Sequence, residues 1–403
     1  FRVLLMATSR RLGRLGRGVF DRNDRRKQAY RYTSAGTDAL PLVDLSLGST
    51  DLPPPAVALE AIEDALRTPE SSSYCLQAAT RPFREAVAAW SKRRFGVSVD
   101  PDREVLLLVG SQEGTAHLPL AVLDPGDAAL ILDPSYPSHR GGLVLADARI
   151  ERLQLRQEQC WRPDFNALSN SKWDQLRMMV FGFPHNPTAQ VGEQSWLAEA
   201  MERGIRHQVV VAHDNPYVDL ALEGDAPALL LCPGWREWGI EFFSFSKGWC
   251  LGGFRLAFAI GAEPLITALR ELKGVVDFNQ SLALQRGAIA ALSDAPDWPQ
   301  QILEVYRERR DRTLAALGAL GWHVPCPSMA LYLWLPVPAW AKQQGFNDET
   351  LAADLLDRTG IALTPGSGFG SGGDDWLRLA LVQPVEDLEA AVARMGPWWH
   401  AHI

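Results

Sequence analysis

The sequence predicts an α/β protein built on a mainly parallel sheet, followed by a smaller α+β domain. Short apolar runs bounded by turn residues recur through the middle of the chain, at lengths typical of strands buried on both faces of a sheet. Amphipathic segments of helical length, such as residues 193–206, lie between most of these runs, and such alternation is typical of parallel sheets. From about residue 296 helices and strands follow in a different order, which indicates a separate unit.

The expected elements follow one another along the chain. Six apolar runs are strand candidates, over residues 105–109, 128–132, 178–183, 209–212, 241–246 and 256–260. The last two follow each other too closely for a crossover helix, so we expect one antiparallel pair there. Beyond them the sequence predicts a helix over 300–320 that ends at Gly321, strands over 330–335 and 376–381, and helices over 348–359 and 385–395.

The length of 403 residues suits two or three packed domains. We expect an N-terminal arm over residues 1–44 that joins the smaller domain or reaches over a partner subunit, a large domain over 45–294, and a small C-terminal domain over 295–403. The tract GSGFGSGGDD matches the dinucleotide pattern G-x-G-x-x-G at Gly368, Gly370 and Gly373. A strand-like segment follows it instead of a helix, so we expect a loop.

Composition narrows the classes of partner and compartment. A formal net charge of -8 argues against nucleic acid as a partner. No apolar run approaches the roughly 18 residues of a membrane helix. The five cysteines include no C-x-x-C pair, which favours reduced thiols and a cytoplasmic location. The first residues, FRVLLMATSRRLGRLGRG, leave two interpretations open: an Arg-rich transit peptide or, as we favour, an upstream start site with Met6 as the true first residue.

A lysine stands at the end of an apolar run in FFSFSKGWCLGGFR, residues 242–255. A lysine in water has a pKa of about 10.4, but burial and cationic neighbours lower that value and free the amine as a nucleophile. Ser244 and Arg255, on either side of Lys247, offer a hydroxyl and a planar fork suited to phosphate oxygens. The alternative is a structural lysine at a strand end.

Polar side chains also follow other predicted strands. Asp214 comes just after VVVA, where ligands of α/β sheets bind, and its carboxylate could keep a pyridinium nitrogen protonated. Tyr217, three residues later, could donate to a ring hydroxyl. The alternative for Asp214 is a helix cap. Asn186 in FGFPHNPTAQVG is either a ligand or part of an Asn-Pro turn.

Three further segments carry candidate binding residues. Ser111 and Gln112 follow a strand and open a helix, whose N-terminus would bind phosphate or would simply be capped. Tyr136 in DPSYPSH could stack on a flat ring or lie in a surface turn. Arg378 lies inside the apolar run WLRLAL, and a buried arginine needs an anionic partner. That partner would be a substrate carboxylate or a structural ion pair.

Taken in order, these segments resemble the pyridoxal-phosphate-dependent aminotransferases of fold type I, class I/II. The likeness runs from SLGSTDLPPP at Ser46 to WLRLAL at Trp376, over nearly the whole chain. It implies a three-layer sandwich around a mixed, mainly parallel seven-stranded sheet. It also implies pyridoxal 5′-phosphate as the cofactor, no metal, and ping-pong transamination between small-molecule amino acids and 2-oxo acids.

The resemblance also implies a role for each candidate residue. Lys247 would form the internal aldimine, Asp214 would pair with the pyridine nitrogen, and Tyr217 would bind the phenolic oxygen together with Asn186. The phosphate would be held by Ser111, Gln112, Ser244 and Arg255, and the ring would stack on Tyr136. Arg378 would grip the substrate α-carboxylate, with Asn186 and the backbone at Gly48. Tyr74 would cross the interface of a homodimer to the partner's phosphate, so the active site would be shared.

Two positions depart from the family's pattern, and the substrate stays open. Ala189 and Ala79 stand where glycine is common, and alanine is strained if these turns need a positive φ. The leader LGRGVFDRNDRRKQAYR resembles those of aspartate and LL-diaminopimelate aminotransferases, which favours glutamate and 2-oxoglutarate with aspartate- or LL-diaminopimelate-like donors. The alternatives are a β-eliminating C–S lyase of the same fold and a non-catalytic cofactor-binding regulator.

Overall fold

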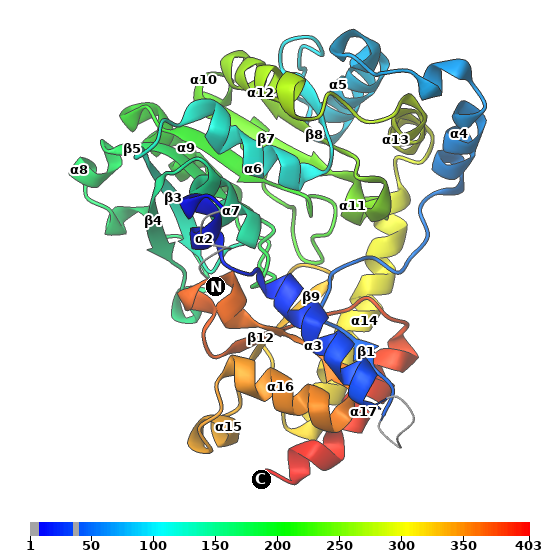
Figure 1. Cartoon of the computed structure of the whole chain (residues 1–403), viewed down its shortest axis with the longest axis vertical. Helices are drawn as coiled ribbons and strands as arrows, with labels where there is room; N and C mark the ends of the chain where they lie inside the picture. Colours follow the sequence, from blue (N-terminus) through cyan, green and yellow to red (C-terminus); the bar gives the residue numbers. More distant parts are fainter. Residues whose placement is uncertain (1–7, 35–39) are drawn as a thin grey trace.

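The computed structural model describes residues 8–34 and 40–403. The choice of Met6 as first residue falls outside these ranges. The chain forms a large unit around a seven-stranded sheet and a smaller unit around two short sheets, and the long helix α14 (Trp298–Leu320) runs between them (Figure 1). Within the described residues, no helix combines the length and the apolar character that crossing a membrane requires.

The large sheet has the strand order β2-β8-β7-β6-β5-β3-β4. Its strands are β2 (Val105–Leu108), β3 (Ala128–Asp133), β4 (Arg149–Gln154), β5 (Leu176–Phe181), β6 (Val210–Asp214), β7 (Gly239–Ser244) and β8 (Ala257–Gly261). Strand β8 is antiparallel to both β7 and β2, and the other neighbours are parallel. The mixed, mainly parallel sheet and the antiparallel pair near residues 241–260 are therefore confirmed.

Strand β4 is the one strand of this sheet that the apolar runs did not predict. Its sequence RIERLQ is mostly polar, and among its residues only Leu153 is buried. The strand lies at the edge of the sheet and, in the described parts of the chain, pairs only with β3. An edge strand exposes one side to solvent, so it lacks the continuous apolar run of its neighbours.

Helices cover both faces of the large sheet and make three layers. On one face, side chains of α6 (Ser111–Val122), α7 (Pro137–Leu145) and α12 (Glu263–Val276) pack with alternate strand residues such as Met178 and Phe242. On the other face, α5 (Arg81–Phe95) and α9 (Gln194–His207) pack with the residues between them, such as Met179 and Phe243. Burial of both faces explains the continuous apolar runs.

The smaller unit contains an antiparallel sheet with the order β11-β12-β9 and a parallel pair of β1 and β10. These strands are β1 (Val43–Asp44), β9 (Tyr332–Pro336), β10 (Ile361–Ala362), β11 (Thr364–Pro365) and β12 (Trp376–Ala380). Around them lie α14, α15 (Ala339–Gln343), α16 (Asp348–Thr359) and α17 (Val385–His400). As predicted, α14 ends at Gly321, with a φ of 96°, and the Gly-rich tract forms turns instead of a nucleotide loop.

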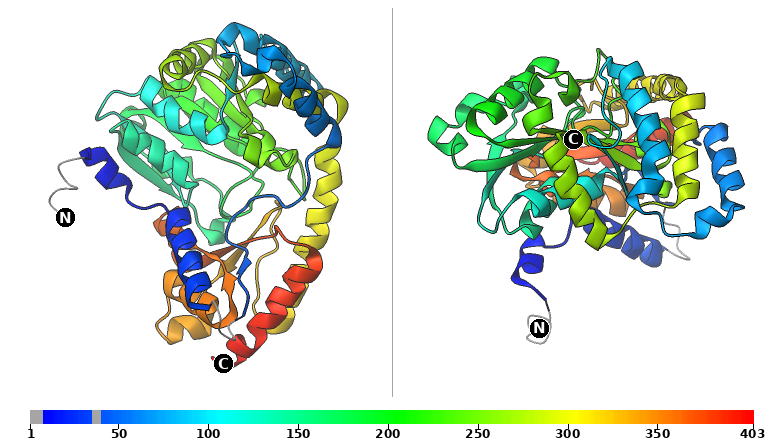
Figure 2. Two further views of the ribbon diagram at one scale, coloured as in Figure 1. Left: turned by 45° about the vertical axis from the view of Figure 1, so that its right-hand side comes forward. Right: turned by 90° about the horizontal axis from the view of Figure 1, so that it is seen from above.

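The N-terminal arm touches both units (Figure 2). Helix α2 (Arg10–Leu15) packs on α7 of the large unit, whereas α3 (Val19–Ser34) runs along the smaller unit against α16 and β11. Strand β1, at the end of the arm, pairs with β10. The division at residues 44 and 294 stays a prediction. The remaining helices are α4 (Ala56–Leu66), α8 (Asn170–Trp173), α10 (Trp235–Trp238), α11 (Phe245–Gly248) and α13 (Leu282–Asp294).

Candidate active site

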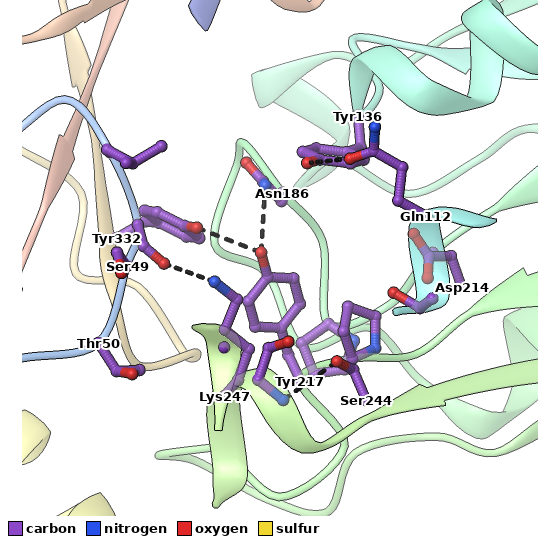
Figure 3. A pocket seen from close by; sticks show the side chains of 18 of the residues that line it. Ser49, Thr50, Gln112, Tyr136, Asn186, Asp214, Tyr217, Ser244, Lys247 and Tyr332 are labelled. Atoms are coloured by element: carbon purple, nitrogen blue, oxygen red, sulfur yellow. Dashed lines mark hydrogen bonds between the residues drawn. The ribbon is translucent and has the colours of Figure 1, made fainter. Parts of the chain in front are cut away.

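A cavity of about 310 Å³ opens where the carboxyl ends of the parallel strands meet the smaller unit (Figure 3). Most of the candidate residues line it. They are Gly48, Ser111, Gln112, Tyr136, Asn186, Asp214, Tyr217, Ser244, Lys247, Arg255 and Arg378. Side chains from distant parts of the sequence thus meet in one space. The remaining candidate, Tyr74, lies elsewhere.

Lys247 lies on the one-turn helix α11, directly after β7. The Ser244 hydroxyl caps this turn by accepting from the Ser246 N–H at 3.1 Å. The Lys247 ammonium donates to the Gly48 carbonyl oxygen, so it points into the cavity (Figure 3). Burial lowers the pKa of Lys247, and the nearby charges of Arg378 and Arg255 lower it further. This environment raises the share of neutral, nucleophilic amine at neutral pH.

Asp214 ends β6 and is buried. Its Oδ2 lies 3.1 Å from Nε2 of His139, on the first turn of α7. Its Oδ1 is also buried but has no hydrogen-bond partner among the described residues. A buried carboxylate oxygen without a donor is costly, so this atom calls for a donor from a bound group.

The strand end that carries Asp214 is held by a second buried carboxylate. His213 accepts from the Phe183 N–H at 3.0 Å through Nε2, so its proton lies on Nδ1 and is donated to Glu241 at 2.7 Å. Asn215 donates to the same Glu241 oxygen at 2.8 Å. The residues on both sides of Asp214 are therefore fixed by one fully buried network.

Arg378 is a buried cation that no carboxylate of the described residues contacts. Only 1% of the residue is exposed, and none of the ion pairs among the described residues includes it. Its guanidinium donates to Asn186 Oδ1 and to the Ser46 carbonyl, each at 2.8 Å, while its Nε has no partner. Of the two partners considered for this arginine, the structural ion pair is thus absent from the described part of the chain, and an anionic ligand fits.

Two tyrosines and an amide form a chain of hydrogen bonds beside Lys247 (Figure 3). Asn186 donates to the Tyr217 hydroxyl at 3.2 Å, and that hydroxyl lies 3.2 Å from the hydroxyl of Tyr332. Burial raises the pKa of Tyr217. Burial alone would raise the pKa of Tyr332 too, but the charges of Lys247 and Arg378 outweigh it and lower that pKa. Lys247 therefore lies among polarised phenol groups.

The opposite end of the cavity is suited to a phosphate. Helix α6 begins at Ser111, so its first N–H groups lie beside this space. Gly110 has a φ of 81°, and a Cβ there would overlap the guanidinium of Arg255, which explains the glycine. The Tyr136 hydroxyl donates to Gln112 at 3.3 Å, and burial raises the pKa of Tyr136 to about 12, so the phenol stays neutral.

Of the lining residues that the sequence did not predict, three contact the groups described above. His139 lies in the first turn of α7, three positions after Tyr136, which precedes the helix. Side chains three residues apart lie on the same side of a helix, and this spacing was the signal in the sequence. Tyr332 comes from β9, and its hydroxyl approaches the backbone of Gly48 so closely that a Cβ there would overlap it. Phe20 comes from α3, and the guanidinium of Arg378 lies 5.5 Å from the centre of its ring. No local pattern marks the last two.

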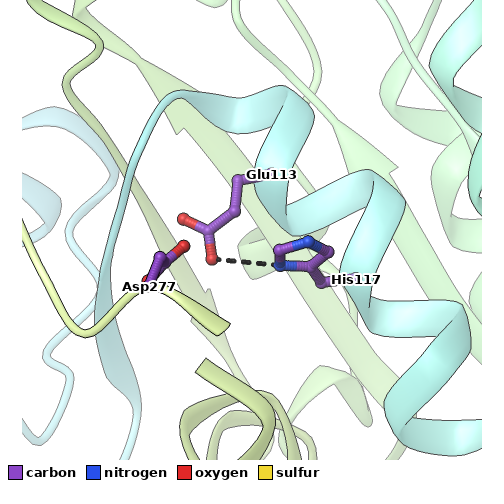
Figure 4. A group of neighbouring side chains, drawn as sticks. All are labelled: Glu113, His117 and Asp277. Carbon is purple, nitrogen blue, oxygen red and sulfur yellow. Dashed lines mark ion pairs between the residues drawn. The ribbon is translucent and has the colours of Figure 1, made fainter. Parts of the chain in front are cut away.

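Glu113, His117 and Asp277 form a cluster that resembles a metal site (Figure 4). The ammonium of Lys273 already lies among them, 3.0 Å from Glu113 and 2.6 Å from Asp277. Glu113 also accepts from the Val109 N–H at 2.6 Å, just before the start of α6. The cluster therefore ties α12 to the phosphate end of the cavity by means of a lysine.

Tyr74 lies away from the cavity and is 88% exposed. Its ring contacts Phe278, with the ring centres 6.0 Å apart. Further exposed apolar side chains on the same two segments are Leu76, Val275 and Val276. This apolar surface around Tyr74 and Phe278 is the kind that subunits cover.

The family model described as aminotransferase class I and II matches residues 41–395. The chain belongs to this family. It is a pyridoxal-phosphate-dependent aminotransferase, as the resemblance of its motifs predicted.

Named relatives cover nearly the whole aminotransferase. It is 38% identical to the LL-diaminopimelate aminotransferase of Dehalococcoides mccartyi over 88% of this chain and 90% of that protein. The solved structure of a probable N-succinyldiaminopimelate aminotransferase from Thermus thermophilus has a TM-score of 0.87 at 39% identity, over 94% of this chain and 99% of that one. The aspartate aminotransferase from Thermus thermophilus with maleate has a TM-score of 0.86 at 25% identity, over 97% and 99% of the two chains.

The cavity of this aminotransferase fits pyridoxal phosphate. The partnerless Oδ1 of Asp214 suits the N–H of a pyridinium ring, and the amine of Lys247 suits the aldehyde carbon. Ser111, Ser244 and Arg255 offer donors to a phosphate. The donors and acceptors that the chain leaves open in the cavity are thus complementary to those of the cofactor.

The two positions that depart from the family's pattern differ in their backbone. Ala189 has a φ of 57°, a left-handed conformation that costs a non-glycine residue roughly 1 kcal/mol. Its N–H donates to the His185 carbonyl at 2.8 Å, so the tight turn forms despite the alanine. Ala79 lies in the short helical turn Gln77–Thr80 and has no positive φ. The expected strain therefore applies to Ala189 alone.

Proposed function

We propose that this aminotransferase moves the amino group of a diaminopimelate-type amino acid to 2-oxoglutarate, which gives glutamate. The observation that carries the proposal is the buried guanidinium of Arg378, which has no carboxylate of its own among the described residues and suits the α-carboxylate of an amino acid. The choice of donor rests on two relatives, whose names both refer to a substrate that contains diaminopimelate.

Lys247 is the base in this proposal. It is the only primary amine among the lining residues that the structure describes, and its lowered pKa leaves part of it uncharged. Bound pyridoxal phosphate withdraws electrons from the substrate Cα and so acidifies the proton there. The amine of Lys247 takes that proton, and the neighbouring Tyr332 hydroxyl helps to hold the resulting charge.

Other residues orient the reactants. Asp214, steadied by His139, places a negative charge where the ring nitrogen would lie. Asn186 holds both Arg378 and Tyr217, so it couples the position of the substrate carboxylate to the phenol that would face the cofactor's ring oxygen. The backbone at Gly48 completes the carboxylate site. The ring of Phe20 covers Arg378 and keeps water away from it.

A homodimer completes the site in this proposal. Tyr74 would reach the phosphate in the partner subunit's cavity, and the exposed apolar surface around Tyr74 and Phe278 would be covered. Mixing two inactive variants, Lys247→Ala and Tyr74→Ala, tests the sharing directly. A hybrid dimer would carry one intact site, so random reassortment should restore about a quarter of the parent activity. No recovery in a mixture shown to contain hybrids would refute the shared site.

The substrate is tested with a panel of amino donors against 2-oxoglutarate, read by the glutamate formed. We expect the highest kcat/KM with LL-diaminopimelate or its N-succinyl derivative, and a lower one with aspartate. If alanine gave the same kcat/KM as these donors, the enzyme would not select its donor by the charged group at the far end of the side chain, and the proposed substrate would be refuted. A cysteine conjugate tested without 2-oxo acid checks the lyase alternative, because pyruvate and ammonia would then appear. A cytoplasmic location stays a prediction, supported by five free cysteines.

A further inference from the structure

A second cavity, of about 570 Å³, lies between the N-terminal arm, the large unit and the Gly-rich tract. It shares no lining residue with the active site, but consecutive residues line the two: Val19 and Phe20 on the arm, and Ser135 and Tyr136 before α7. The two cavities therefore have a common wall.

The second cavity is strongly basic. Five arginines line it, Arg14, Arg17, Arg22, Arg140 and Arg152, whereas Asp133 has the single carboxylate among the lining residues that the structure describes. That carboxylate is already engaged, since it accepts from Gln154 at 3.0 Å, from Ser371 at 2.8 Å and from the Gly372 N–H at 2.8 Å. The cavity thus has a net excess of positive charge and little free acceptor capacity.

Three of these guanidinium groups lack a close carboxylate. Arg140 donates to the carbonyls of Arg14 and Leu15 at the end of α2, at 2.7 and 3.2 Å, and so faces only neutral acceptors. Arg152 is 3.6 Å from Asp133 and makes no closer polar contact within the described residues. Arg17 has no side-chain partner in the same part of the chain. By contrast, Arg14 pairs with Asp147 and Arg22 with Glu349.

Two further features favour an anion in this space. Burial and the charge of Arg152 lower the pKa of Arg140, so the two cations repel each other across the cavity. The hydroxyl oxygen of Ser367, another lining residue, is buried and has no partner among the described residues. Helix α3 begins at Val19 on the rim, where the positive end of its dipole adds to the field.

We propose that this arginine-lined cavity binds a small oxyanion, either phosphate or a dicarboxylate, which bridges Arg17 of the arm to Arg140 and Arg152 of the large unit. The bound anion neutralises cations that no carboxylate contacts closely among the described residues, and it holds the arm on α7. Because Phe20 lies on the same segment and over Arg378, the anion also fixes the wall of the active site. The site is distinct from the one proposed for the substrate, and its test does not depend on turnover.

The test measures binding to holoenzyme whose cofactor has been fixed to Lys247 with borohydride. Inorganic phosphate and glutarate are titrated separately by calorimetry at an ionic strength held constant with NaCl, which distinguishes the two sources of oxyanion. We expect at least one of them to bind once per chain and to bind at least ten-fold more weakly in Arg17→Gln/Arg152→Gln. Neither arginine makes a hydrogen bond through its side chain in the described residues, so the variant should keep its fold. Arg177→Gln, an exposed arginine of β5 outside the cavity, is the matched control.

A second measurement follows the arm itself. Trypsin cleaves after exposed arginines, which α2 and the adjoining Arg17 supply, and the bound anion should slow this cleavage several-fold in the parent and in Arg177→Gln but not in the double variant. The proposal is overturned if neither anion binds beyond the NaCl control. It is also overturned if the double variant binds as tightly as the parent, because the anion would then lie elsewhere, at Arg378 for glutarate. Transamination assays on the same variants before borohydride treatment report separately on the proposed function.

Discussion

Replacing Arg378 with lysine should lower kcat/KM as well as stability. The two-pronged guanidinium is placed to receive a carboxylate, and its donors now face only Asn186 and the Ser46 carbonyl. Lysine keeps the charge but loses the fork, so we expect the loss of one charge-assisted hydrogen bond to substrate, about 1.5–3 kcal/mol. That free energy corresponds to a decrease of about 10- to 200-fold in kcat/KM. Lysine cannot keep both of the buried hydrogen bonds that Arg378 donates to Asn186 and the Ser46 carbonyl, so the free energy of unfolding should also fall, by about 1–3 kcal/mol.

Arg309 provides the matched contrast. It is equally buried, but its fork already holds Asp51 through two contacts of 2.7 Å. Arg309→Lys should therefore lower the free energy of unfolding by about 1–3 kcal/mol but spare kcat/KM, because Arg309 does not line the cavity. Steady-state rates with a preferred donor and urea unfolding of both holoenzymes give the two quantities. An Arg378→Lys variant that unfolds easily but keeps its kcat/KM would refute the assignment of Arg378 to substrate.

Three other outcomes are expected. Lys247→Ala should lose at least about 10²-fold in kcat while still binding cofactor, seen by absorbance; turnover at the parent rate would exclude Lys247 as the base. Tyr332→Phe keeps the ring 4.4 Å from the Arg378 guanidinium but removes the hydroxyl near Tyr217, so kcat should fall about 2- to 10-fold at constant KM. Burial lowers the pKa of His185 to about 3, so between pH 6.5 and 3 only the unfolded state binds this proton. The free energy of unfolding should therefore decrease as the pH is lowered below 6.5, by up to about 1.4 kcal/mol per pH unit. His185→Gln should reduce this dependence in urea titrations at pH 7 and 5.

The residues at strand ends were predictable from the sequence because the fold places them. Lys247 and Asp214 each follow a run of buried residues, and parallel strands bring such ends to one edge of the sheet. The same reasoning located Ser111 at the start of a helix. Local pattern was sufficient there because strand, turn and site residue are adjacent in the chain.

The parts that were missed depend on distant segments. Tyr332 and Phe20 reach the cavity from the smaller unit and from the arm, and their positions follow from packing that no local pattern encodes. Strand β4 was missed because an edge strand carries polar residues. The lack of an ion pair at Arg378 among the described residues is likewise a property of the assembled fold, since it depends on every carboxylate that could have approached.

Lys273 gives the phosphate end of the cavity a cation that is covalently part of the protein. A dissociable ion between Glu113 and Asp277 would have to be acquired after synthesis and could be stripped by a chelator or exchanged for another ion. Lys273 is part of the polypeptide from synthesis onward and cannot dissociate. The shape of the first turn of α6 is thus independent of the metal content of its surroundings.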